Sequence, residues 1–270
     1  MIRLESRHYA FLGLFLTVLV TMLLGIKPAI GISDDTRKMF NYIDSLPAGS
    51  TLMVSFDHEA SALPEIRPLA LAILRHAFSK GHKVVGVALM AEGTAVGYRL
   101  LQTVAKEYAR VYGQDYVFLG FKPQYIAAIL SMGESIPKTF PEDYLGTPYG
   151  QIPLLRNVRN YNDLAGVISI SDGNLATHWI EYGHARFNVT VTAAVTAAMV
   201  TSYDPYLSSG QLHAMVGGLR GAAEYEELIK VGGGGIRGML AQSASHLYIL
   251  LLILIGNIAY FQARRKQGRG

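Results

Sequence analysis

The stretch TLMVSFDHEASALPEIRPLALAILRHAFSKGHKVVGVALM, residues 51–90, decides the fold. It begins with a short apolar run, TLMVSF, and ends with another, KVVGVALM. Between them lies an amphipathic segment, residues 66–79, which Lys80 and Gly81 terminate. Two apolar strands joined by a helix are typical of a β-α-β unit, in which the strands are parallel. We therefore expect a parallel sheet with helices on both faces.

The same alternation continues along the chain. Further apolar runs typical of buried strands lie at residues 116–121, 164–170 and 189–195. Helical spacing of apolar residues is found at 94–112, 124–131 and 175–186, and we also expect helices at 208–216 and 221–229. The pattern predicts an α/β fold, a three-layer sandwich with a mainly parallel sheet of about five strands, Rossmann-like or flavodoxin-like.

Two uncharged apolar segments flank this region. Residues 9–26 and 239–261 are each long enough to cross a bilayer core of ~30 Å as a helix. The expected organisation is a tail (1–8), a first transmembrane helix (9–26), an α/β domain (27–231), a glycine-rich joint (232–238), a second transmembrane helix (239–261) and a basic tail (262–270).

Basic residues in both tails predict the orientation in the cell membrane. Arg3 and Arg7 precede the first apolar segment, and Arg264, Arg265, Lys266 and Arg269 follow the second. Lys and Arg favour the cytoplasmic side, so both termini are expected there and the domain outside the cytoplasm. The alternative is that the first segment is a cleaved signal peptide, since Ala29-Ile30-Gly31 has the small-x-small pattern of a cleavage site.

Small and polar residues in the two apolar segments predict helix packing. Gly13, Thr17, Thr21 and Gly25 recur every four residues and would share one helix face, where small side chains allow close approach of a second helix. Asn257 lies within the second segment, and its amide would seek a partner on another helix. The expected partners are membrane lipid and either a second copy of the chain or another membrane protein.

Composition excludes several classes of function. The chain has no Cys, which rules out disulfides, thiolate metal sites and a Cys nucleophile. Between positions 27 and 245 there are 18 Lys and Arg against 19 Asp and Glu, so the domain lacks the positive charge of a nucleic-acid-binding protein. Neither the dinucleotide fingerprint G-x-G-x-x-G nor the phosphate loop G-x-x-x-x-G-K-S/T occurs, and we expect no cofactor and no metal.

Two places carry candidate chemistry. Sites in open α/β sheets form where strands end at their carboxyl edge, and Asp57, Glu59 and Asp172 follow two of the expected strands. They could support metal-assisted hydrolysis, or serve only as polar loop and capping residues. The stretch GGLRGAAEY, 217–225, could hold an anion with Arg220 between Gly218 and Gly221, or use its small residues for packing.

These observations leave three hypotheses for function. The leading one is a membrane-anchored, non-catalytic component of an oligomer or scaffold, because both ends carry apolar segments and no complete catalytic motif occurs. The first alternative is a ligand-binding or sensor domain with an anion site near Arg220. The second is a metal-assisted hydrolase using Asp57, Glu59 and Asp172.

Overall fold

The computed structural model describes residues 5–24 and 29–267, which divide into two units. The larger unit spans residues 30–235 and contains the α/β domain. The smaller contains the described residues before and after it, which form two helices.

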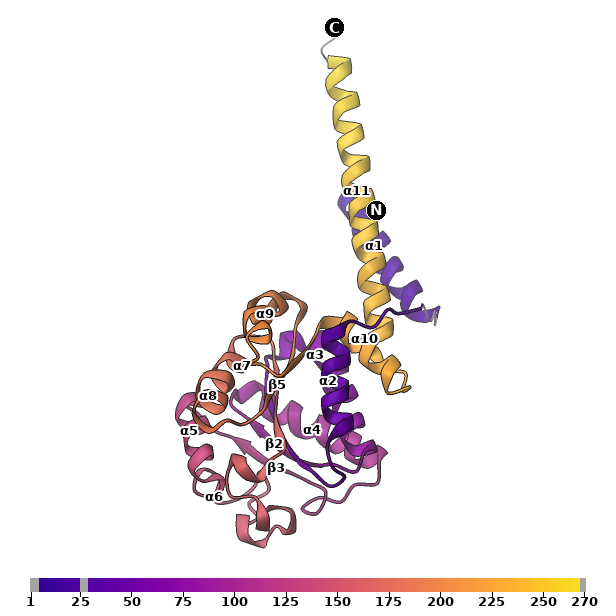
Figure 1. Cartoon of the computed structure of the whole chain (residues 1–270). Helices are drawn as coiled ribbons and strands as arrows, with labels where there is room; N and C mark the ends of the chain where they lie inside the picture. The colour runs from indigo at the N-terminus through magenta and orange to yellow at the C-terminus, as the bar shows by residue number, and fades with distance from the viewer. Residues whose placement is uncertain (1–4, 25–28, 268–270) are drawn as a thin grey trace. The chain divides into compact units, whose positions relative to one another are not determined.

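A six-stranded, entirely parallel sheet forms the centre of the larger unit (Figure 1). Its strands are β1 (Thr51–Asp57), β2 (Lys83–Ala88), β3 (Tyr116–Phe121), β4 (Gly166–Ser171), β5 (Val191–Val195) and β6 (Ala214–Gly217). They lie in the order β3-β2-β1-β4-β5-β6. This is the strand order of the Rossmann fold, so the predicted α/β class and parallel sheet are confirmed, and the flavodoxin-like alternative is not adopted.

Helices cover both faces of the sheet. On one face lie α2 (Asp34–Ser45), α3 (Leu63–Ser79), α4 (Ala91–Glu107) and α10 (Gly218–Leu228). On the other lie α5 (Tyr125–Glu134), α6 (Ile136–Thr139), the helical segment formed by α7 (Leu175–His178), η5 (Trp179–His184) and α8 (Ala185–Phe187), and α9 (Val200–Ser208). Short 3₁₀ turns complete the unit: η1 (Ala60–Ala62), η2 (Tyr149–Gln151), η3 (Pro153–Asn157), η4 (Tyr161–Asp163) and η6 (Ala197–Met199).

Strand residues alternate between the two cores. Val54 of β1 belongs to the core that includes residues of α3 and α4, whereas its neighbour Met53 belongs to the core on the opposite face. Both are fully buried, as are their partners in register on β4, Ile168 and Val167. Burial of a side chain of this size contributes ~1.5–3 kcal/mol, which explains why both faces of the strands are apolar in sequence.

The sheet has one strand more than the sequence predicted. Residues 208–216 were expected to be helical, and this prediction is wrong: α9 ends at Ser208, and β6 begins at Ala214 and pairs with β5. A four-residue strand carries too little periodicity to be recognised, and only its hydrogen bonds to β5 define it. Residues 135–160, which follow α5, contain α6 and two 3₁₀ turns.

A helix begins within the glycine-rich run at the end of the domain. The sequence predicted a joint over 232–238, but α11 (Gly234–Gln267) begins within this run. The carboxylate of Glu226 accepts a hydrogen bond from the backbone N–H of Gly235 at 2.8 Å. A negative charge that caps free N–H groups stabilises the first turn of a helix, so the helix can begin among glycines.

The smaller unit contains α11 and α1 (Ser6–Leu23). Among the described residues, one helix is long and apolar enough to cross a membrane, Gly234–Gln262. The described apolar part of α1, Arg7–Leu23, is too short to meet the same length requirement. Residues 25 and 26 of the predicted first span lie outside the described residues. The structure therefore supports one membrane-spanning helix where the sequence predicted two.

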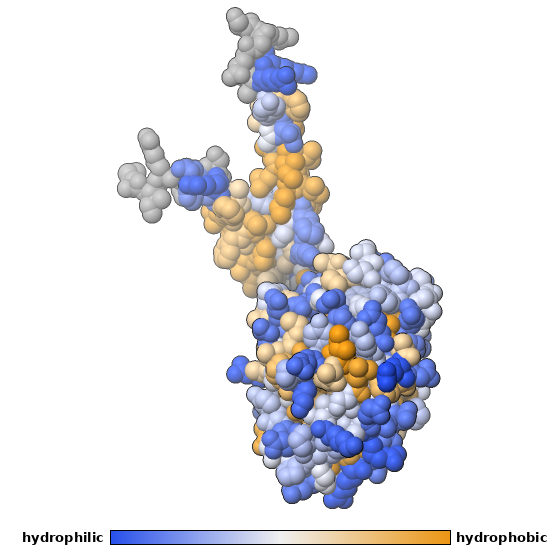
Figure 2. Space-filling view, turned by 90° about the vertical axis from the view of Figure 1, so that its left-hand side faces the viewer, coloured by the Kyte–Doolittle hydropathy of each residue, from blue (hydrophilic) through white to orange (hydrophobic). Residues whose placement is uncertain are grey.

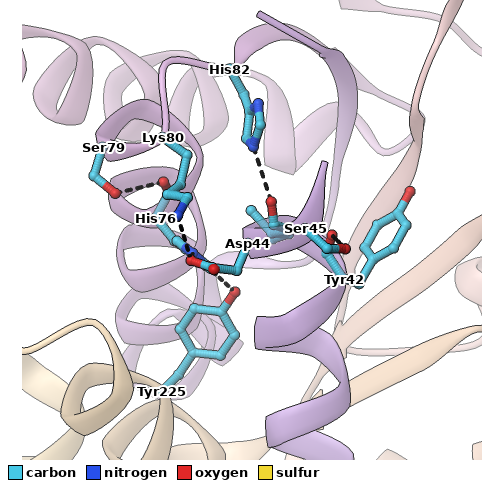
Figure 3. A network of polar contacts seen from close by, with 9 residues as sticks. Tyr42, Asp44, Ser45, His76, Ser79, Lys80, His82 and Tyr225 are labelled. Carbon is cyan, nitrogen blue, oxygen red and sulfur yellow. Dashed lines mark hydrogen bonds and ion pairs between the residues drawn. The ribbon is translucent and has the colours of Figure 1, made fainter. Parts of the chain in front are cut away.

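A closed polar network ties three helices of the domain together (Figure 3). His76 of α3 is 2% exposed and stacks on Phe40, with ring centroids 4.4 Å apart. Its Nε2 lies 3.3 Å from Asp44 Oδ1 of α2, and its Nδ1 lies 2.9 Å from the hydroxyl of Tyr225 of α10. Because a carboxylate can only accept, the neutral ring donates from Nε2, and Nδ1 accepts from Tyr225. Burial lowers the pKa of His76, which favours this neutral form.

Candidate functional site

A pocket of about 580 Å³ opens at the carboxyl edge of the sheet. Strands β1 and β4 are neighbours there, and the chain leaves β1 toward α3 on one face and β4 toward α7 on the other. This reversal is the switch point at which open α/β sheets bind ligands. The pocket is lined by Glu59, Ser61, Ala62, Glu65, Met90, Ser171, Asp172, Gly173, Asn174, Leu175, Thr196 and Ala198. We call it the switch-point pocket.

Hydrogen bonds between neighbouring loops shape this pocket. Asp172, which follows β4, accepts the backbone N–H of Glu59, which follows β1, at 2.8 Å. Glu65, in the first turn of α3, accepts the backbone N–H of Ala197, which follows β5, at 2.5 Å. Charge-assisted bonds of this kind are stronger than neutral ones. The exits of β1, β4 and β5 are therefore held together before any ligand arrives.

Negative charge dominates the pocket. Three carboxylates line it, those of Glu59, Glu65 and Asp172, and no Lys or Arg is among the described residues of its wall. No group of three or more His, Cys, Asp or Glu side chains in the described part of the chain is arranged to hold a metal ion. The three carboxylates are therefore spread around the hollow, an arrangement suited to a molecule carrying positive charge more than to a bare ion.

Asp57 is placed differently from the other two predicted acids. Its side chain is fully buried and does not line the pocket; Oδ1 accepts the backbone N–H of Leu89 at 2.8 Å, and Oδ2 accepts from Nε1 of Trp179 at 3.4 Å. Burial raises the pKa of Asp57 to about 6, although these bonds and the nearby hydroxyls of Ser55 and Ser169 favour the charged form. Glu59 and Asp172 meet at the pocket, whereas Asp57 is buried and pairs in register with Ser171, a residue of the pocket wall.

Trp179, whose indole faces Asp57, lies on an irregular helix. Residues 179–184 are π-helical, between the α-helical turns of α7 and α8. Single π-helical turns are often found at functional sites. Here Trp179 is fully buried, and its indole N–H points toward Asp57. His58, which follows Asp57 in the chain, is also buried, and burial lowers the pKa of its ring, so this histidine contributes no charge to the site above neutral pH.

The predicted anion site near Arg220 has a carboxylate inside it. Arg220 Nε donates to Glu224 Oε1 at 2.9 Å, and the Arg220 side chain is 74% exposed. Gly221 and Arg220 line a second hollow of about 460 Å³, while Gly218 packs against Ala197 and Glu65. The ligand-binding role of these three residues remains a prediction, and Arg220 already has an internal counter-ion.

The predicted helix-packing residues lie in the smaller unit. A Cβ on Gly13 would lie 2.1 Å from the hydroxyl oxygen of Tyr248 of α11, and that hydroxyl donates to the carbonyl of Ala10 at 3.1 Å. Thr17 and Thr21 donate to carbonyls one turn earlier in α1, and Asn257 does so in α11. Gly25 lies outside the described residues.

Sequence reasoning missed Glu65, the third acid of the pocket. It lies six residues beyond Glu59, after the short turn η1, and becomes part of the wall because α3 begins at the exit of β1. Its position could have been predicted, because the first turn of a helix that follows a parallel strand lies at the carboxyl edge of the sheet. Its bond to Ala197 depends on β5 lying beside β4, which sequence does not disclose.

No family model matches this chain, and comparisons with curated proteins and with solved structures give no significant match. The strand order and pocket define a Rossmann-like α/β domain. The exit of β1, Asp57-His58-Glu59-Ala60, lacks the glycine-rich loop that binds dinucleotide phosphates in many such domains.

Proposed function

We propose that this protein is a membrane-anchored binding protein whose switch-point pocket takes a small organic cation. The observation that carries the proposal is the charge of the pocket wall, with three carboxylates and no basic side chain among its described residues. A phosphate or carboxylate ligand would meet repulsion there, whereas an amine or guanidinium would gain charge-assisted hydrogen bonds.

The size of the pocket agrees with this proposal. Pockets for small molecules have volumes of roughly 300–1,000 Å³, and this one has about 580 Å³. Met90 and Leu175 add apolar surface to the wall, so a ligand with a short hydrocarbon part beside its charged group would fit better than a fully polar one. The hydroxyl of Ser61 donates to Glu59 Oε2 at 3.4 Å, so this carboxylate can also orient a polar group of the wall toward a ligand.

Thermal-shift measurements on the full-length protein in detergent would test this proposal. The probes are agmatine, choline and spermidine, with citrate as an anionic control. We expect at least one cation to raise the melting temperature and citrate to leave it unchanged, because a ligand that binds only the folded state stabilises it. The double variant Glu59→Gln with Asp172→Asn should weaken the affinity for that cation about tenfold or more.

The matched control is Glu134→Gln, which removes one exposed carboxylate at the end of α5, away from the pocket wall. It should leave cation binding unchanged. A cation effect that the double variant and Glu134→Gln reduce equally would indicate general charge attraction, and an absence of any cation effect would exclude this ligand class.

The proposed location is the cell membrane, with two membrane passes, both termini in the cytoplasm and the domain outside it. The long apolar helix Gly234–Gln262 supports the second pass, and the contact of Tyr248 with α1 supports a paired first helix. The basic residues after the second helix support the orientation.

The absence of Cys makes the orientation directly testable. Single variants Ser208→Cys in the domain and Gln267→Cys in the C-terminal tail can be labelled with a membrane-impermeant maleimide on intact cells. We expect Ser208→Cys to react without permeabilisation and Gln267→Cys to react only after it. The reverse pattern would place the domain in the cytoplasm. Labelling of both on intact cells would contradict a two-pass topology.

An assembly component is the second candidate, favoured by an apolar patch on α5. Figure 2 shows hydrophobic residues gathered on the side of the domain that carries this helix. A shallow hollow of about 370 Å³ lies there, lined by Gln124, Tyr125, Ile126, Ala127 and Leu130. Exposed apolar patches rimmed by polar residues are typical of protein interfaces.

Light scattering of the detergent-purified protein tests this second candidate. If the chain self-associates through α5, the variant Tyr125→Asp should lower the measured mass toward that of a monomer. Val111→Asp, at another exposed apolar position, is the matched control and should leave the mass unchanged. A monomeric wild-type protein would argue against self-association.

A further inference from the structure

Helix α10 holds the segments by which the chain enters and leaves the α/β domain. Glu224 accepts hydrogen bonds from the backbone N–H and the hydroxyl of Ser33, at 3.0 and 2.5 Å, where the chain enters. Glu226 accepts the backbone N–H of Gly235 at 2.8 Å, where it leaves. Both glutamates are almost fully buried. Residues two apart on a helix point in nearly opposite directions, so one helix reaches both segments.

The contact at the exit is very close. A Cβ on Gly235 would lie 2.7 Å from the backbone nitrogen of Ala223 and 2.9 Å from Cβ of Ala222. The segment that leaves the domain therefore lies directly on the backbone of α10. Since there is no space between them, a displacement of α10 must move this segment as well.

The other end of α10 lies against the switch-point pocket. Gly218, its first residue, has a positive φ of +66°, and a Cβ there would lie 2.9 Å from Cβ of Ala197 and 3.0 Å from Oε1 of Glu65. Ala197 donates its N–H to this same carboxylate, and its neighbours Thr196 and Ala198 line the pocket. The loop after β5 is thus enclosed between the pocket and the start of α10.

Helix α3 provides a second connection between the same two places. Glu65 lies in its first turn at the pocket, and His76 lies near its end, bound to Tyr225 of α10 (Figure 3). The two helices also pack side by side over one face of the sheet. Contacts at both ends of α10 therefore depend on the position of α3.

We propose that α10 couples occupation of the switch-point pocket to the two segments through which the domain continues into its terminal helices. This inference rests on the proposed binding function. A cation that pairs with Glu65 draws its carboxylate away from Ala197, which frees the loop against which Gly218 packs. The two arrangements are Glu65 bonded to Ala197 and Glu65 paired with the cation. A ligand shifts the equilibrium between them only by binding one arrangement better, and Glu65 is the residue whose contacts differ.

Hydrogen exchange of the full-length protein in lipid nanodiscs tests the coupling. The readout is the exchange rate of peptides covering residues 30–36 and 232–238, which contain the amides bonded to Glu224 and Glu226. The variant Glu65→Ala removes the acceptor of the Ala197 N–H. We expect it to raise exchange in both peptides by about tenfold, because local opening becomes easier.

The matched control is Glu59→Ala, which removes a carboxylate from the same pocket without touching α10, and should leave both peptides unchanged. Equal exchange in Glu65→Ala and the wild type would overturn the coupling, as would an equal increase in the two variants. Circular dichroism of each variant verifies that the protein remains folded.

The cation experiment separates this inference from the proposed function. If spermidine binds the wild type and changes exchange in both peptides, the coupling is supported. If it binds and neither peptide changes, the coupling fails while the binding function stands. If no cation binds but Glu65→Ala raises exchange, the ligand class is wrong and the connection through α10 remains.

Discussion

The switch-point pocket and the network around His76 each bring polar side chains from several elements together. The two regions differ in how many of these polar atoms have a hydrogen-bonding partner within the protein. In the network, both ring nitrogens of His76 have a partner, and Asp44 also pairs with Lys80 at 2.8 Å. In the pocket, Asp172 and Glu65 each use one carboxylate oxygen on a backbone N–H, and within the described residues the other oxygen has no hydrogen-bonding partner.

This difference separates a structural cluster from a binding site. Polar groups that satisfy one another inside the protein contribute to stability, and removing one leaves the others unpaired. Carboxylate oxygens that are unused around a hollow contribute little to stability themselves and are available to a ligand. Substitutions in the two regions should therefore affect different measurements.

The largest effect on stability is expected in the closed network. His76→Ala removes the stacking on Phe40 and leaves the buried hydroxyl of Tyr225 without its acceptor. We expect a loss of about 2–4 kcal/mol in the free energy of unfolding, measured by urea denaturation, with cation binding retained. A loss below about 0.5 kcal/mol would mean that the network is not structural.

A smaller, pH-dependent effect is expected at Asp57, which is fully buried at the end of β1. Its folded pKa of about 6 lies above the usual 3.8, so the protonated form is favoured in the folded state. This stabilisation is fully present below the unfolded pKa and is lost as the pH rises through 6. Relative to Asp57→Asn, the wild type should lose stability on the order of 2–3 kcal/mol between pH 4 and pH 7.

Comparison of the two proteins at each pH isolates this contribution, because every other titrating group is common to both. Parallel stability curves for the wild type and Asp57→Asn would show that Asp57 titrates normally in the folded protein. A wild type that gains stability relative to the variant as the pH rises would show that the folded state favours the charged carboxylate.

The smallest effect on stability is expected in the pocket wall. Asp172→Asn keeps an oxygen that can accept the N–H of Glu59 and removes only the charge. We expect a change within about 0.5 kcal/mol in unfolding free energy, together with a severalfold loss of cation affinity measured by calorimetry. Destabilisation as large as that of His76→Ala would place Asp172 with the structural residues.

Much of the fold was predictable because it depends on local patterns. The apolar runs of β1 to β5 are buried on both faces, and such runs can be recognised without knowing their neighbours. Strand β6 was missed because four residues, Ala214–Gly217, become a strand only through hydrogen bonds to β5. The start of α11 was missed for a similar reason, since Glu226 caps it from another helix.

The candidate site was predictable only in part. Strand exits identified Glu59 and Asp172, because the carboxyl ends of parallel strands share one edge. The sequence could not show that Asp57, two residues before Glu59, is buried with Trp179 and Leu89, since those partners come from other elements. It also could not show that Glu65 and Ala197 meet, 132 positions apart.

The sequence by itself determined the parallel α/β class, the apolar helix near the C-terminus and the lack of a phosphate-binding loop, because periodicity, hydropathy and motif spacing are properties of short segments. The tertiary structure decided the strand order, the pocket between β1 and β4, and the role of α10 at both ends of the domain. These depend on which distant residues become neighbours, and that is fixed only when the whole sheet assembles and its two faces are buried.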